Sequence, residues 1–256
     1  SVSSFRNAFV GASSFNQDIG DWDVSNVVTM ESMFSQASSF NQDISEWTVN
    51  NVTNMYSMFS GATSFDQPIG TWAVANVTNM NSMFAQASSF NQDISGWEVS
   101  NVTNMNSMFG GASSFNQPIG TWDITGVTDL EYMFSYASSF NQNLNSWDVS
   151  QITSMYGLFN GASSFNSSLD LWNTGNVTDL SYLFLSASNY NQDISGWDVS
   201  NVTTMKGTFM SATSFNQALN SWTVSFVTDM DGMFYHADIF NQDLSNWNVG
   251  NVVYMN

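Results

Sequence analysis

The 256-residue chain has no cysteine and almost no basic residues. The lack of cysteine excludes disulfides and thiolate chemistry. Lysine and arginine together number 2, against 21 aspartates and glutamates, and the formal net charge is −19. Nucleic-acid binding is excluded because phosphate contacts need many basic side chains, and attraction to anionic membranes fails for the same reason. No apolar run approaches the roughly 18 residues of a membrane span, so we expect no direct membrane insertion within this segment.

Aromatic residues, in contrast, are abundant and evenly spaced. Hydrophobic residues make up 43% of the chain and aromatic residues 15%, which is too apolar for a disordered acidic chain. The 10 tryptophans recur at one constant spacing without insertion, at positions 22, 47, 72, 97, 122, 147, 172, 197, 222 and 247. Such a fixed period indicates a repeat array. We divide the single repeat domain, 1–256, into a partial first unit (1–12), nine full units (13–237) and a partial last unit (238–256).

Each unit divides into two halves with different apolar spacing. In the unit 88–112, Trp97 and Val99 alternate with polar residues, which is typical of a strand. Apolar residues then recur at Val102, Met105, Met108, Phe109 and Ala112, a spacing that favours one face of a helix. Because Trp shares the parity of Val, burial of the Trp column is favoured over an exposed sugar-stacking ladder. Methionine is interpreted as core filler, since leucine replaces it in some units.

A strand and a helix in one unit of this length cannot bury their apolar faces alone, whereas stacked copies can. The sequence therefore predicts an α/β solenoid, a right-handed, leucine-rich-repeat-like array of about ten strand-plus-helix coils with a parallel sheet on one face. A nearly constant asparagine column is expected to bond open backbone groups at a bend and to form a ladder through the stack. This structural ladder consists of Asn16, Asn41, Asn91, Asn116, Asn141, Asn166, Asn191, Asn216 and Asn241, and Asp66 interrupts it.

The recurrent pattern SSFNQDIS-W-DVSNVTNM-SMF-GA, which covers essentially the whole chain, resembles the leucine-rich repeats of BspA-like bacterial and protist surface proteins. The resemblance implies a curved α/β solenoid, an extracellular or cell-surface location, and a role in adhesion or partner contact. It brings no catalytic residues. The chain also has no cysteine nucleophile, and His236 is its single histidine, so we expect no enzyme activity.

Acidic residues fall in two stacked columns, one after the Asn-Gln pair and one directly after Trp. Carboxylates stacked about 5 Å apart repel each other, and Ca²⁺ accepts flexible shells of carboxylate and carbonyl oxygens. A calcium site is therefore one hypothesis, and a solvated acidic face that keeps the array soluble is the other. The candidate calcium ligands are Asp18, Asp43, Asp23, Glu98, Asp123 and Asp148.

Variation on one face of a constant scaffold is how repeat proteins present a binding surface. The predicted binding face comprises Asp21, Glu46, Asp23, Glu98, Asp123, Asp148 and Asp198. The first functional hypothesis is a non-enzymatic cell-surface adhesion or recognition module, whose acidic polar face contacts a surface protein or a glycan. The alternative is a calcium-binding structural repeat protein. The uncovered ends of the array also predict end-to-end self-association.

Overall fold

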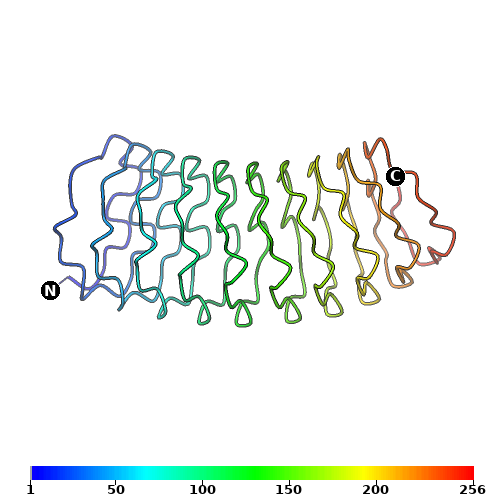
Figure 1. The fold of residues 1–256 in the computed structure, drawn as a ribbon, viewed down its shortest axis with the longest axis horizontal. Coiled ribbons are helices and arrows are strands. Elements are labelled where there is room, and N and C mark those ends of the chain that lie inside the picture. The colour runs from blue at the N-terminus through cyan, green and yellow to red at the C-terminus, as the bar shows by residue number, and fades with distance from the viewer. Residues whose placement is uncertain (1) are drawn as a thin grey trace.

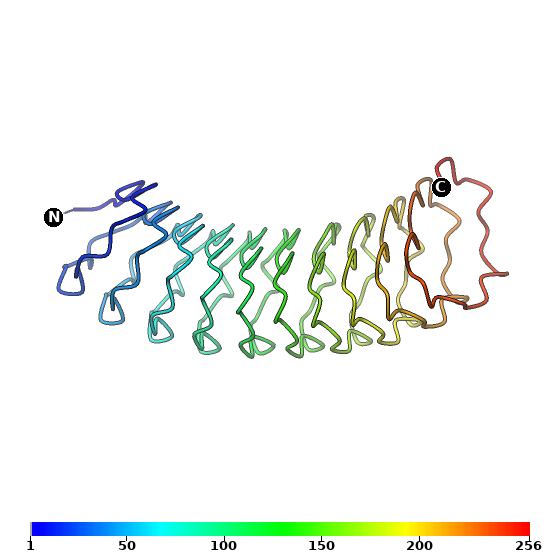
Figure 2. The ribbon, with the colours of Figure 1, turned by 90° about the horizontal axis from the view of Figure 1, so that it is seen from above.

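The protein is a row of similar coils stacked side by side (Figure 1). The computed structural model describes residues 2–256. The chain advances by one coil in each repeat unit, and backbone hydrogen bonds join each coil to its neighbours, as from the Thr78 N–H to the Thr53 carbonyl, 2.9 Å. Seen from above, the row bends into a shallow arc (Figure 2). The repeat unit of the sequence is thus also the structural unit of the molecule.

The prediction of an α/β solenoid with a parallel sheet is wrong. Residues 2–256 contain no helix and no extended strand. The only β-type pairing among them consists of isolated parallel bridges between a residue and its equivalent in a neighbouring coil, such as Asn54 with Asn79 and Asn79 with Asn104. The coils are built from turns instead.

The segment predicted as a helix is a run of tight turns. The Met58 N–H donates to the Met55 carbonyl at 3.2 Å, which closes a four-residue turn rather than a helical one. Its third residue, Ser57, has a φ of 51°, and further along the same segment Gly61 has a φ of 71°. Left-handed residues at these two positions recur along the chain and are incompatible with a continuous right-handed helix.

The remaining backbone donors of this segment point to the following coil. The N–H groups of Ser57, Phe59 and Gly61 donate to carbonyls of the next coil at 2.9, 2.9 and 2.7 Å. Along this segment, N–H groups that donate within the coil alternate with N–H groups that donate to the next coil. This division satisfies the backbone without a helix, while the apolar residues still share one side.

The segment around Trp alternates as predicted but does not form a strand. Trp97 and Val99 are 3% and 2% exposed, whereas Glu98 between them faces solvent. The indole connects this segment to the preceding coil, because Trp97 Nε1 donates a hydrogen bond to the Ile69 carbonyl at 3.1 Å. The alternation therefore predicts burial correctly although no backbone ladder accompanies it.

The core consists of parallel aromatic columns. Phe84 and Phe90 stack within one coil with ring centroids 3.9 Å apart, and Phe84 stacks on Phe109 of the next coil at 5.8 Å. Beside them, Trp97 and Trp122 are almost parallel at 6.5 Å. The predicted burial of the Trp column is confirmed in the inner coils, where methionine also fills the core. Trp22, in the first coil, is 39% exposed.

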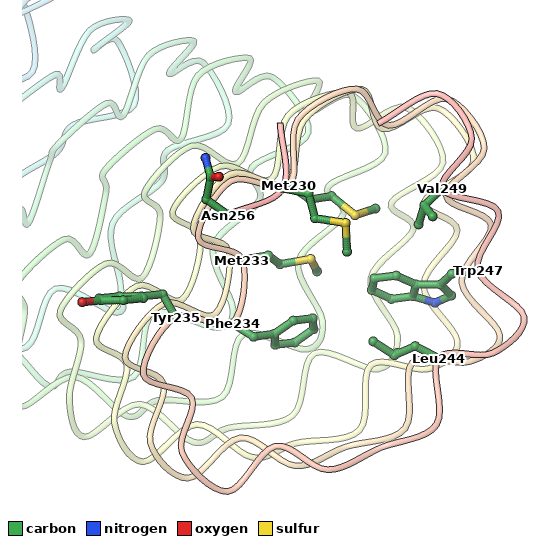
Figure 3. A pocket seen from close by; sticks show the side chains of 9 residues that line it. Met230, Met233, Phe234, Tyr235, Leu244, Trp247, Val249 and Asn256 are labelled. Carbon is green, nitrogen blue, oxygen red and sulfur yellow. The ribbon is translucent and has the colours of Figure 1, made fainter. Parts of the chain in front are cut away.

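The last coil leaves part of this core uncovered. Met230, Met233, Phe234 and Trp247 point into a cavity of about 470 Å³ on its open side (Figure 3). The equivalent residues of the middle coils, such as Met105 and Phe109, are completely buried because a further coil covers them. End-to-end self-association stays a prediction.

Candidate binding faces

The first exposed face comprises the columns of Asp21 and Asp23, which flank the buried Trp column, and is called the acidic face. Residues of both columns are exposed in every coil. The Asp21 column carries Asp, Glu, Thr, Gly, Thr, Ser, Leu, Gly, Ser and Asn along the chain. Since the neighbouring Trp and Val columns barely change, the variation is confined to solvent-facing positions. The residues predicted for the binding face all lie here.

Aspartates of this face also stabilise the backbone turn that follows them. An oxygen of Asp148 accepts the Ser150 N–H at 2.9 Å, and Asp123 accepts the Thr125 N–H at 3.1 Å. Hydrogen bonds from the side chain and backbone of Ser150 hold the pKa of Asp148 below its ordinary value. For Asp123 the same effect on the pKa comes from Thr125, opposed by the negative charge of Asp148 on the next coil. These carboxylates are therefore ionised turn caps.

The acidic column of Asp18 and Asp43 plays the same part at another turn. Asp18 accepts the Gly20 N–H at 3.0 Å, and Asp43 accepts the Ser45 N–H at 2.9 Å. No group of three or more His, Asp or Glu side chains within residues 2–256 is arranged to hold a metal ion. The aspartates of the Asp18 column and those of the Asp23 column cap two different backbone turns. Calcium binding stays a prediction.

The asparagine column lies on a neighbouring bend, and its side chains link successive coils. Asn116 Oδ1 accepts both the Asn141 N–H and the Gln142 side-chain amide of the next coil at 2.9 Å. Asp66, which interrupts the column, accepts the Asn91 N–H at 2.9 Å in the same way. These side chains are half-buried or exposed rather than buried. The equivalent backbone bond is received by Asn16, Asn41, Asn91, Asn141, Asn166, Asn191 and Asn216, and Asn241 donates the last one.

A second variable face, absent from the sequence-based prediction, lies on the turn segment. It comprises the columns of Arg6, Asn7, Val10 and Gly11 and is called the turn face. Six of the chain's 8 tyrosines fall in these columns, namely Tyr56, Tyr132, Tyr136, Tyr156, Tyr182 and Tyr235, as do both basic residues. The basic residues are paired with the following coil, Arg6 with Glu31 at 3.0 Å and Lys206 with Asp231 at 3.2 Å.

The turn face lines the inner side of the curve. In Figure 3, Tyr235 points outward on the side of the coil opposite Trp247 and Val249, and the earlier coils bend away towards that same side. The C-terminus, Asn256, belongs to the Arg6 column and lies on the concave side in Figure 2. The acidic face and the turn face are therefore on opposite sides of the stack.

A groove of about 610 Å³ runs along the turn face in the N-terminal half of the molecule. It extends from Gln36 to Tyr136, and Gln86, Ser107 and Tyr132 lie between them. Beyond the groove the aromatic surface continues, since Tyr132 meets Tyr156 edge-on at 5.0 Å and Tyr156 meets Tyr182 at 5.4 Å. Partial burial raises the pKa of the Tyr132 phenol above its ordinary value, at which the hydroxyl is already protonated at physiological pH.

Comparison with known proteins identifies the repeat family. The family described as Mycoplasma protein of unknown function, DUF285, matches residues 1–95, 67–172 and 153–256, so the chain belongs to this family of repeat proteins. No curated protein matches the sequence. Residues 2–256 contain no helix with the length and hydropathy needed to cross a lipid bilayer.

Two solved structures show a distant likeness. A leucine-rich repeat protein from Bacteroides ovatus is 12% identical over 96% of this chain and 78% of its own, with a TM-score of 0.36. The leucine-rich repeat ectodomain of the membrane receptor kinase GASSHO1/SCHENGEN3 from Arabidopsis thaliana, solved with Casparian strip integrity factor 2, is 10% identical. The match covers 90% of this chain and 34% of that ectodomain, with a TM-score of 0.25. The narrower resemblance to BspA-like proteins stays a prediction.

Proposed function

We propose that the chain is a non-enzymatic recognition module of a cell-surface or extracellular protein, and that the acidic face contacts polar surface proteins or glycans. One observation carries this proposal. The core columns hold almost the same residue in every coil, while the exposed positions between them differ from coil to coil. A constant scaffold with a changing outer row offers each partner a particular sequence of side chains.

The charge of the acidic face indicates what such a partner needs. Glu98, Asp123 and Asp148 occupy consecutive coils of one exposed column, so their charges form a row. The chain as a whole is strongly acidic, which favours partners with exposed basic or hydrogen-bond-donating groups. Association through this face should weaken as salt rises.

Binding of the intact chain to arrays of immobilised proteins and glycans tests the proposal. Beads coated with the chain are compared with beads coated with the triple variant Glu98→Gln, Asp123→Asn, Asp148→Asn, which removes three charges but keeps side-chain oxygen acceptors. We expect the unchanged chain to bind at least one immobilised partner, and the triple variant to bind it several-fold more weakly.

A matched control removes the same number of charges elsewhere. Asp93→Asn, Asp193→Asn and Asp243→Asn alter turn caps of the Asp18 column, outside the acidic face. This control should bind like the unchanged chain. The proposal is overturned if no immobilised protein or glycan is bound, or if both triple variants lose binding equally.

A further inference from the structure

Two tyrosines at one end of the groove adopt a backbone conformation that is unfavourable for bulky residues. Tyr132 and Tyr136 both have a φ of 56°, whereas their equivalents in the next coil are Gly157 and Gly161. A side chain in this left-handed region costs about 1–2 kcal/mol. Tyr136 is 61% exposed, so its burial recovers little of that cost. The left-handed backbone recurs at these positions in the other coils, where glycine, serine or glutamine mostly fills it, so the turn does not require a tyrosine; an exposed aromatic ring kept at such a position points to a function for the ring.

The following coil is shaped to receive these two rings. A Cβ atom at Gly157 would lie 2.7 Å from Cδ1 of Tyr132, and a Cβ atom at Gly161 would lie 2.6 Å from Cδ1 of Tyr136. Each ring therefore leans onto glycine backbone of the next coil, where any side chain would displace it. The rings are held in place at the end of the groove rather than free in solvent.

The rest of the groove offers neutral hydrogen-bonding groups. The amides of Gln36 and Gln86 line it and can both donate and accept. The hydroxyls of Ser82 and Ser107 also line it; each donates to the side-chain oxygen of the preceding asparagine, at 2.7 and 2.8 Å, and remains available as an acceptor. Among the described residues that line the groove none is charged, although the chain has a net charge of −19. The groove therefore offers hydrogen-bonding groups without a charged side chain in its lining.

From these features we infer that the groove on the turn face is a binding site for a neutral oligosaccharide. A sugar ring presents an apolar C–H face that packs on an aromatic ring, and hydroxyl groups that match amides and serines. The groove crosses four coil steps, or about 19 Å at about 4.8 Å each, which accommodates several linked sugars. Its volume lies within the range of small-molecule sites. An anionic sugar meets a repulsive field from the surrounding protein.

This site is separate from the acidic face, so either proposal can fail alone. The test is calorimetric titration of the intact chain with neutral tetrasaccharides of glucose, galactose, mannose and N-acetylglucosamine. We expect at least one to bind. Tyr136→Gly should weaken that binding by about tenfold or more, as expected for an aromatic residue that packs on a sugar ring. Because glycine relieves the left-handed strain, the variant should melt at the same temperature as the unchanged chain or higher.

Three further measurements assign the binding to the groove. Tyr56→Ser, which removes a tyrosine of the same face outside the groove, should bind the sugar normally. Tyr136→Phe should retain most of the binding, because the ring face remains. The acidic-face triple variant should bind the sugar unchanged.

The inference is overturned by any of four results. The first is that none of the four neutral sugars binds at millimolar concentration, and the second is that Tyr136→Gly binds the sugar normally. The third is that sulfated or sialylated sugars bind more tightly than neutral ones, and the fourth is that a peptide occupies the groove in place of a sugar.

Discussion

Tyr190 is a single hydroxyl in an otherwise apolar column. It replaces the phenylalanine found at equivalent positions, its side chain is completely buried, and its ring stacks on Phe184 with centroids 3.9 Å apart. Within residues 2–256 its hydroxyl has no hydrogen-bond partner. Burial also raises the pKa of the phenol, so the group stays protonated. An unpaired buried hydroxyl lowers the stability of the folded state.

Tyr190→Phe should therefore raise the free energy of unfolding by about 1–3 kcal/mol, the usual penalty of a buried polar group without a partner. Urea unfolding measures the change. Tyr156→Phe, made on the partly exposed turn face, is the matched control and should change stability little. A loss of stability in Tyr190→Phe would mean that the hydroxyl is satisfied after all.

The left-handed positions of the turn segment give a second test at the residue scale. Gly111 has a φ of 74°, and a Cβ atom there would meet only ordinary contacts at 3.4 Å. Gly111→Ala should thus report backbone strain and cost about 1–2 kcal/mol. Gly96→Ala is the control, since its added Cβ meets nothing within 4 Å and its φ is not left-handed. Equal effects in urea unfolding would contradict the role assigned to the turns.

At the scale of the structural elements, the bend at the asparagine column depends on one side-chain oxygen per coil. Asn116→Ala removes the acceptor of the Asn141 N–H and of the Gln142 amide, and should cost about 1–3 kcal/mol. Asn116→Asp should cost much less, because Asp66 already accepts the equivalent N–H in its own coil. Thermal unfolding of the two variants compares them directly, and equal losses would contradict the ladder.

The aspartate turn caps make the stability of the coils dependent on pH. Bonds from Ser45, Ser95, Ser150 and Ser200 lower the pKa values of the four aspartates that they face. A lowered folded-state pKa contributes stability above the ordinary value of about 3.9, which is lost as the pH falls through the folded value. The melting temperature should therefore fall below about pH 4. Changing the four aspartates, Asp43, Asp93, Asp148 and Asp198, to asparagine keeps the acceptors and should flatten this fall; an unchanged fall would contradict it.

The sequence predicted the period, the core columns and the exposed rows beside Trp, because burial follows from the spacing of apolar residues alone. It did not predict the turns. The spacing of Met105, Met108, Phe109 and Ala112 suits one face of a helix, and the same spacing also arises in successive turns. The available signal was the frequent glycine at the positions of Gly111 and Gly157, since both require a left-handed backbone.

The turn face was missed for the same reason. A helix over this segment would place these residues on its outer side, where polar variation has no particular meaning. Only the turn geometry places Tyr132 above Gly157 and Tyr136 above Gly161. In the sequence alone this relation exists only as a tyrosine followed by glycine at the same position of the next repeat unit.

At the scale of the whole molecule, the net charge of −19 acts against the close stacking of coils. Sodium chloride screens this repulsion, and the Debye length falls to about 10 Å at 0.1 M. The melting temperature should therefore rise with sodium chloride. If the calcium hypothesis holds, millimolar Ca²⁺ should raise it further than Mg²⁺ at the same ionic strength. Equal effects of the two ions would remove that hypothesis, and a fall with sodium chloride would contradict the repulsion.

The hydrogen bonds between coils join nearest neighbours, as between Ser57 and Asn81 or between Asn116 and Asn141. Cohesion is therefore divided into many similar seams, each holding one layer to the next. If this chain tethers a cell to a surface under flow, tension along its long axis would open one seam at a time. Each coil that unfolds would lengthen the chain and dissipate work while the remaining coils stay stacked, so the protein would extend stepwise under load rather than fail at one point.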